Sequence, residues 1–143
     1  MRRAVFKLQT EVGLPVDDYL AKKLKWSKEE LFKRLSSAQV EAVALFVRNS
    51  ELRRTGLVNS DGTGVGKGRT LATVIQYALD NGKIPVFITQ GKHLYSDMAG
   101  RDMPGIGNKT FKPFITDSVA TYENGKGETV TEANGAAARD TRR

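Results

Sequence analysis

The stretch that decides the fold is Asp61-Gly62-Thr63-Gly64-Val65-Gly66-Lys67-Gly68. A loop that binds phosphate needs small residues, so that successive backbone N–H groups can turn toward an anion, and a helix that begins directly behind them. It also needs a lysine that reaches the β- and γ-phosphates. Gly62, Gly64 and Gly66 are the small residues, and Lys67 is the lysine. The sequence therefore predicts a phosphate loop that holds a nucleotide.

The loop departs from its usual form at two positions. Asp61 stands where the first glycine is usual, and Gly68 stands where a Ser or Thr hydroxyl normally binds magnesium. The nearest hydroxyls belong to Thr63 and Thr70, and we expect the metal contact, direct or through water, at Thr70 or else at Thr63. A plain glycine-rich turn with a surface lysine is the alternative. A dinucleotide site is excluded, because no acidic residue ends the second predicted strand.

The pattern of apolar residues places the loop between a strand and a helix. Residues 55–60 are typical of a short strand, 69–79 of an amphipathic helix, and 84–89 of a buried strand. A helix over 92–103 and a short strand over 111–115 are predicted next. This order predicts an α/β fold with a parallel sheet, as in part of a P-loop NTPase (RecA-like) lobe.

A small helical region is predicted before the lobe. Residues 1–16 have no sustained period, whereas the pattern from Val16 to Leu52 is helical. Ser27 followed by Glu30, and Ser36 followed by Gln39, both have the form of a capping box at a helix start. Trp26 is expected in the core between helices. The predicted organisation is a helical region at 1–54, the partial lobe at 55–117 and a flexible tail at 118–143.

The composition excludes several classes of protein. The 143 residues include no cysteine and one histidine, so the sequence offers no disulfide scaffold, thiol nucleophile or multi-histidine metal site. The longest apolar run, 42–47, is far shorter than the roughly 20 residues of a membrane span, so we expect a cytoplasmic chain (in the host cell if it is phage-encoded) and no membrane partner. A net charge of +7 suits a nucleic-acid partner, but solubility alone also favours such a charge.

Two runs of the sequence resemble a known family. Leu35 to Val43 (LSSAQVEAV) and Gly62 to Thr70 (GTGVGKGRT) are similar to the N-terminal part of strawberry notch-type proteins, which are superfamily-two helicase-like ATPases. Some phage antirestriction proteins carry the same module. The resemblance covers about residues 35–107, and the glycine after the lysine is characteristic of the group.

The resemblance implies a role for particular residues. Gln39 would read the adenine of ATP, although it is also explained as the capping partner of Ser36. Gln90 and Lys92 would contact the backbone of DNA, with a solvated helix start as the alternative for Lys92. With magnesium held at Thr70, the residues implied to bind ATP are Gln39, Gly62, Thr63, Gly64, Val65, Gly66, Lys67, Gly68, Arg69 and Thr70.

Hydrolysis in this superfamily also requires an acidic motif and a second lobe. Asp117 follows an apolar run but is interpreted as a turn, so we expect the acidic motif and the downstream lobes after Arg143. No catalytic residue is assigned, and negligible turnover is expected from this piece alone. The rival hypothesis is a nucleic-acid-binding or antirestriction accessory module with a vestigial loop. A small kinase is disfavoured because no acceptor site is evident.

Overall fold

The structure is a computed structural model that describes residues 2–59, 64, 66–116 and 119–133. The chain divides into two compact units, residues 1–85 and 86–143. No helix in the described ranges combines the length and the hydropathy that crossing a bilayer requires.

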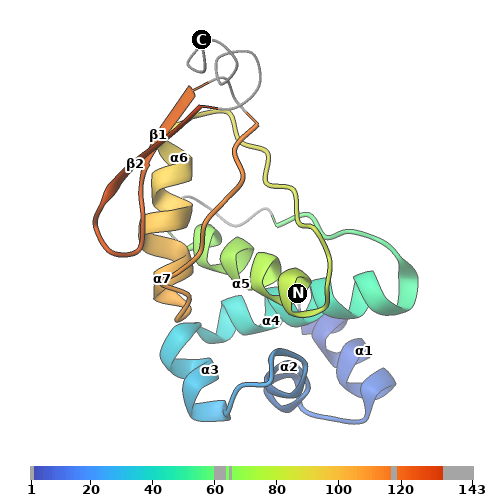
Figure 1. Cartoon of the computed structure of the whole chain (residues 1–143). Coiled ribbons are helices and arrows are strands. Elements are labelled where there is room, and N and C mark those ends of the chain that lie inside the picture. The colour runs from blue at the N-terminus through green and yellow to red at the C-terminus, as the bar shows by residue number, and fades with distance from the viewer. Residues whose placement is uncertain (1, 60–63, 65, 117–118, 134–143) are drawn as a thin grey trace. The chain divides into compact units, whose positions relative to one another are not determined.

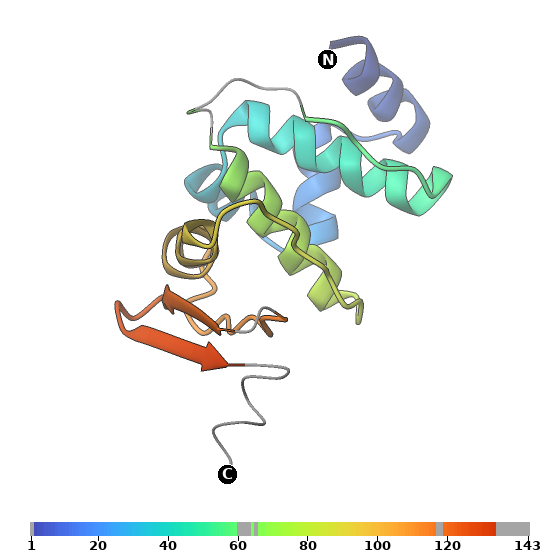
Figure 2. The ribbon, with the colours of Figure 1, turned by 90° about the horizontal axis from the view of Figure 1, so that it is seen from above.

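The first unit is built from helices (Figure 1). Helix α4 lies at its centre, because α1, α2 and α5 all pack against it, and Figure 2 shows α4 and α5 next to each other. The turn η1 is a wide, π-type continuation of α4. The elements in chain order are α1 (Arg2–Val12), α2 (Val16–Leu24), α3 (Lys28–Arg34), α4 (Ser37–Arg48), η1 (Asn49–Arg53) and α5 (Lys67–Asp80).

Local signals set the helix boundaries of this unit. Both predicted capping boxes are present, so α3 begins after Ser27 and α4 after Ser36. Apolar residues of α4 at helical spacing, Val40, Val43 and Val47, are at most 1% exposed. Helix α1, in contrast, lies where no helix was predicted.

One buried charge belongs to the end of α4. Arg48 is 4% exposed, and its guanidinium pairs with the Glu11 carboxylate of α1, with Nε to Oε2 at 2.7 Å. A buried guanidinium is tolerated only when a partner offsets its lost hydration. The ion pair therefore joins α1 to α4.

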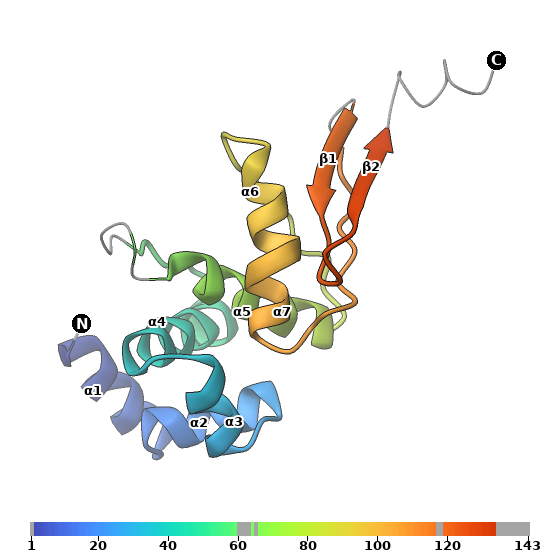
Figure 3. The same cartoon turned by 90° about the vertical axis from the view of Figure 1, so that its left-hand side faces the viewer.

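The second unit combines one helical stretch with a hairpin. The elements α6 (His93–Ser96), η2 (Asp97–Asp102) and α7 (Met103–Gly105) follow each other directly, and Figure 3 shows them as one continuous coil beside β1 (Val119–Glu123) and β2 (Thr129–Ala133). The strands are antiparallel, with Val119 opposite Ala133 and Glu123 opposite Thr129.

The core of the second unit lies between the helical stretch and the hairpin. It contains Ala99, Ile115, Ala120 and Tyr122, all at most 4% exposed. Gly100 lies at a close approach of the two, because a Cβ there would be 2.9 Å from the backbone carbonyl oxygen of Glu123. Packing of η2 on β1 therefore depends on a residue without a side chain.

The predicted parallel sheet is not present in the described residues. Residues 55–59, 84–89 and 111–115 have no strand assignment, and the sheet that the structure describes is the antiparallel hairpin. Val58, Ile84, Val86 and Ile88 are between 79% and 92% exposed. Apolar sequence favours an extended chain, but a strand also needs a neighbour that completes its hydrogen bonds, and no described segment provides one.

The C-terminal segment also differs from its prediction. Residues 118–143 were expected to form a flexible tail, yet the hairpin occupies Val119 to Ala133. The alternation of Ala120 and Tyr122, which are buried, with exposed neighbours is the period of a strand with one covered face. Ser118 and residues 134–143 lie outside the described residues, as does Asp117.

Candidate nucleotide site

Two glycines in the described part of the loop have left-handed backbone. Gly64 and Gly66 have φ values of +91° and +76°, in the left-handed region where glycine is favoured. Gly66 is the residue before α5, which starts at Lys67 and continues through Gly68 and Arg69. The predictions for Asp61, Gly62, Thr63 and Val65 concern residues outside the described ranges.

Gln39 of α4 contacts this loop directly. Its side-chain Oε1 accepts a hydrogen bond from the Ser36 N–H at 2.8 Å, and its Nε2 donates to the Gly66 carbonyl oxygen at 3.0 Å. A Cβ at position 66 would lie 2.4 Å from that Nε2. The capping role predicted for Gln39 is confirmed, and the same amide also holds the loop, so a glycine is needed at 66.

The Gly66 carbonyl oxygen is hydrogen-bonded within the protein. Besides the Gln39 amide it accepts the N–H of Arg69 at 3.0 Å and that of Thr70 at 3.4 Å. The first N–H groups of any helix have no partner within the helix, and they carry its positive dipole end. An anion is therefore favoured at the start of α5, next to Lys67.

Arg69 and Thr70, which follow the lysine in α5, both face the protein interior or a neighbouring helix. The Arg69 guanidinium donates to the Arg34 carbonyl oxygen at 3.4 Å, which joins α5 to the end of α3. Thr70 is 7% exposed. Within the described residues no group of three or more His, Cys, Asp or Glu could hold a metal ion. Magnesium bound to nucleotide needs few protein ligands because it keeps several waters, and the buried residue Thr70 carries one hydroxyl.

The residues predicted to meet nucleic acid belong to the second unit. Gln90 is exposed, and the Lys92 ammonium donates to the Val119 carbonyl oxygen at 2.9 Å. Lys92 therefore supports β1, while an ammonium keeps two further N–H donors. The neighbouring Thr89 hydroxyl is buried and has no hydrogen-bond partner in the described part of the chain. The histidine ring of residue 93 lies over Gly91, where a Cβ would be 2.5 Å from it.

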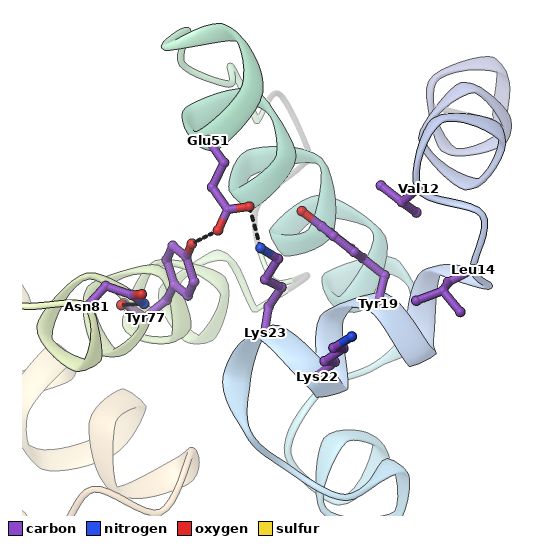
Figure 4. Close-up of a pocket in the computed structure, with 8 residues that line it drawn as sticks. All are labelled: Val12, Leu14, Tyr19, Lys22, Lys23, Glu51, Tyr77 and Asn81. Atoms are coloured by element: carbon purple, nitrogen blue, oxygen red, sulfur yellow. Dashed lines mark hydrogen bonds and ion pairs between the residues drawn. The ribbon is translucent and has the colours of Figure 1, made fainter.

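A separate pocket of about 380 Å³ lies in the first unit, and sequence reasoning did not anticipate it (Figure 4). Glu51 accepts a hydrogen bond from the Tyr77 hydroxyl and pairs with Lys23 at 2.6 Å. Burial raises the pKa of Glu51, but these two donors outweigh burial and bring that pKa below its ordinary value. Burial, helped by the charge of Glu51, raises the pKa of Tyr19 to about 12. These residues are far apart in sequence, so no local pattern pointed to them.

Comparison with known proteins supports the interpretation of residues 61–68 as a phosphate-binding loop. No curated protein and no solved structure gives a significant match to the chain. The family described as "P-loop containing NTP hydrolase pore-1" matches residues 8–136, which include the N-terminal helices as well as the loop. Membership in such a family implies nucleotide binding, usually with magnesium. The chain belongs to this family of P-loop NTP hydrolases.

Proposed function

We propose that the chain is the ATP-binding part of a DNA-directed, strawberry notch-type helicase-like ATPase. Loop 61–68 holds the triphosphate, Lys67 binds the β- and γ-phosphates, and Arg69 joins α5 to the end of α3. The observation that carries this proposal is the loop at the start of α5, held in its left-handed turn by the amide of Gln39.

The nucleotide fits the described residues better than the metal does. The left-handed glycines and the helix start at Lys67 are the parts that receive phosphate oxygens. Magnesium supplies charge neutralisation on the phosphates when it is bound, and Thr70 or Thr63 would provide its hydroxyl. We assign no catalytic residue, and we expect negligible hydrolysis by these residues alone.

In this proposal Gln39 positions the loop and does not recognise the adenine base. Both ends of its amide are used, one by the Ser36 N–H and one by the Gly66 carbonyl. The amide oxygen can accept a second hydrogen bond and the amide nitrogen can donate a second one, so these two contacts do not by themselves exclude adenine. Gln39 acts here as a positioning residue for the loop, and we expect the protein to discriminate little between ATP and GTP through this side chain.

The DNA-directed part of the proposal concerns Gln90 and Lys92. Lys92 retains N–H donors beyond the one used by Val119, and Gln90 is exposed beside it. A charge of +7 on the whole chain favours a polyanion partner. DNA binding at these residues should weaken steeply as salt increases.

Isothermal titration with Mg–ATP tests the nucleotide claim. We expect saturable heat from the unmodified chain and at least a tenfold loss of affinity in Lys67→Ala, because the ammonium is the main charge offered to the phosphates. Lys83→Ala is the matched control, since Lys83 is exposed just after the other end of α5. Equal affinity in Lys67→Ala and Lys83→Ala would contradict the proposal.

The same titration separates the rival function. An accessory module with a vestigial loop would bind DNA in a salt-dependent way, and neither ATP nor Lys67→Ala would change that binding. A chain that binds DNA but gives no heat with Mg–ATP would favour the rival.

A further inference from the structure

Trp26 does not lie in the core, where the sequence analysis placed it. It lies in the turn between α2 and α3 and is half-buried. The guanidinium carbon of Arg34 is 4.4 Å from the centre of the Trp26 ring, within the range of a cation–π contact. Arg34 is steadied by Glu30, one helical turn earlier, at 3.0 Å. Phe32 of the same helix is 48% exposed.

Basic residues outnumber acidic ones around Trp26, with six Lys or Arg and four Asp or Glu between positions 17 and 34. Lys22, Lys25 and Lys33 are exposed. In the described ranges Lys22 and Lys25 form no ion pair, whereas Lys33 interacts electrostatically with Glu30 of the same helix. Lys23 and Lys28, in contrast, have carboxylate partners at 2.6 Å and 2.8 Å. The three exposed lysines therefore come from α2, from the turn and from α3, on either side of the tryptophan in the sequence.

The backbone at Lys25 is unusual for a lysine. Lys25 ends α2 in the left-handed conformation, with φ at +56°. Glycine is the common residue at this position of a helix, and a residue with a Cβ costs about 1 kcal/mol there. A cost of this kind is often found at functional positions. The residue in this conformation, Lys25, carries a positive charge and immediately precedes Trp26 in the sequence.

We propose that Lys22, Lys25, Trp26, Lys33 and Arg34, together the Trp26 surface, bind single-stranded DNA. The lysines neutralise phosphates, and the stacked Trp26–Arg34 pair provides a flat face for a base. A single strand is the partner because its bases are free to stack on a side chain, whereas the bases of a duplex already stack on each other. This inference rests on the DNA-directed part of the proposed function and adds a surface in the first unit.

The Trp26 surface is connected to the two helices that flank the phosphate loop: Arg34 is hydrogen-bonded to α5 and lies two residues before the cap of α4. The carbonyl oxygen of Arg34 accepts the Arg69 guanidinium of α5 at 3.4 Å, two residues after Lys67. Ser36, which caps α4 and meets Gln39, follows Arg34 by two residues. A strand bound at Trp26 would therefore lie next to segments that position the loop.

The single tryptophan makes this proposal directly measurable, because the intrinsic fluorescence of the chain at 295 nm excitation comes from Trp26. Titration with the oligonucleotide dT12 at low salt, without nucleotide, should quench that fluorescence to saturation. The apparent affinity should fall as salt increases, with a log–log slope of about −2 for three phosphate contacts. A duplex of the same length should quench less and bind at least tenfold more weakly.

Two pairs of variants locate the binding, measured by the anisotropy of labelled dT12. We expect Lys25→Gln/Lys33→Gln to weaken binding about tenfold, whereas Lys109→Gln/Lys126→Gln, which removes the same charge from exposed positions of the second unit, should change it less than twofold. Trp26→Phe should keep most of the affinity and Trp26→Leu should lose it, since only the former keeps an aromatic face. Circular dichroism confirms that each variant is folded.

Four outcomes of these experiments would overturn the proposal. Binding of dT12 without quenching, or an equal loss in the two lysine pairs, would mean that DNA binds elsewhere while the DNA-directed function stands. Equal affinity for duplex would refute the single-strand assignment. No dT12 binding at all would refute both the Trp26 surface and the DNA-directed function, while the Mg–ATP titration would still report separately on the nucleotide site.

Discussion

The side-chain amide of Gln39 joins the start of one helix to the phosphate loop before another. Its Oε1 accepts the Ser36 N–H, and its Nε2 donates to the Gly66 carbonyl oxygen, 27 residues further along the chain. A local capping interaction thereby becomes a tertiary contact. Both hydrogen bonds come from one planar group, so the loop and the beginning of α4 are positioned together.

Gln39→Glu separates these two roles. A glutamate can still accept the Ser36 N–H, and it suits the third position of a capping box as well as glutamine does. It cannot donate to Gly66, and its charge faces a carbonyl oxygen. We expect the thermal unfolding midpoint to fall by about 2–4 °C, the effect of losing one hydrogen bond of about 1 kcal/mol, while Mg–ATP binds about fivefold more weakly.

Gln39→Ala is the companion variant, because it removes both hydrogen bonds. It should lose ATP affinity as the glutamate variant does and should also lower the unfolding midpoint further. Unchanged ATP affinity in both variants would mean that the loop does not depend on Gln39.

Gly66→Ala should destabilise the chain for two reasons. An alanine at φ +76° costs about 1–2 kcal/mol, and its Cβ would displace the Gln39 amide that lies 2.4 Å away. Gly82→Ala is a close control, since φ there is +67° and a Cβ would meet nothing within 4 Å. In urea titrations we expect Gly66→Ala to lose about 1 kcal/mol more than Gly82→Ala, the value of the broken hydrogen bond.

The additional loss of stability in Gly66→Ala relative to Gly82→Ala should disappear in a Gln39→Ala background, where the hydrogen bond is already absent. If Gly66→Ala and Gly82→Ala cost the same free energy of unfolding in the unmodified background, the close approach of Gln39 has no energetic consequence.

Glu51→Gln should change how stability depends on pH. The pKa of Glu51 in the folded chain lies below its ordinary value of 4.5, because Lys23 and Tyr77 outweigh the effect of burial. A carboxylate with a lowered pKa stabilises the fold above its unfolded pKa and loses that contribution as pH falls through its folded pKa. We expect Glu51→Gln to cost about 1–2 kcal/mol at pH 7 and progressively less as the pH falls below 4.5.

Chemical unfolding at a series of pH values measures this difference. Glu41→Gln on α4 is the control, since Glu41 makes no ion pair in the described part of the chain. A gap between wild type and Glu51→Gln that is constant from pH 7 to pH 3 would contradict the assignment.

Gly100→Ala tests the packing of the second unit. Alanine is favoured over glycine in a helix by about 1 kcal/mol, yet its Cβ would lie 2.9 Å from the backbone carbonyl of Glu123. Because β1 would have to move, we expect a net loss of about 1–3 kcal/mol. Hydrogen exchange should become faster in β1 and β2, and Gly56→Ala, at an open position of the first unit, should leave those amides unchanged.

The sequence by itself predicted the features that depend on neighbouring residues. The starts of α3 and α4 follow from Ser27 and Ser36, since a capping box closes within four residues. The start of α5 behind a glycine-rich turn follows in the same way, because left-handed backbone needs glycine at 64 and 66. Helix α1 was missed, although Val5 and Leu8 lie three residues apart on its buried side.

Only the tertiary structure decided which distant segments meet. The apolar composition of residues 84–89 does not determine whether a partner strand lies beside them. In the described residues the strand pairing is instead between Val119–Glu123 and Thr129–Ala133. The position of Trp26 outside the core, with the Arg34 guanidinium over its ring, also depended on how the turn and α3 fold together. Contact between Gln39 and Gly66 likewise required α4 and α5 to pack together. Hydrogen bonding across many residues is set by how helices pack, and local sequence carries no record of it.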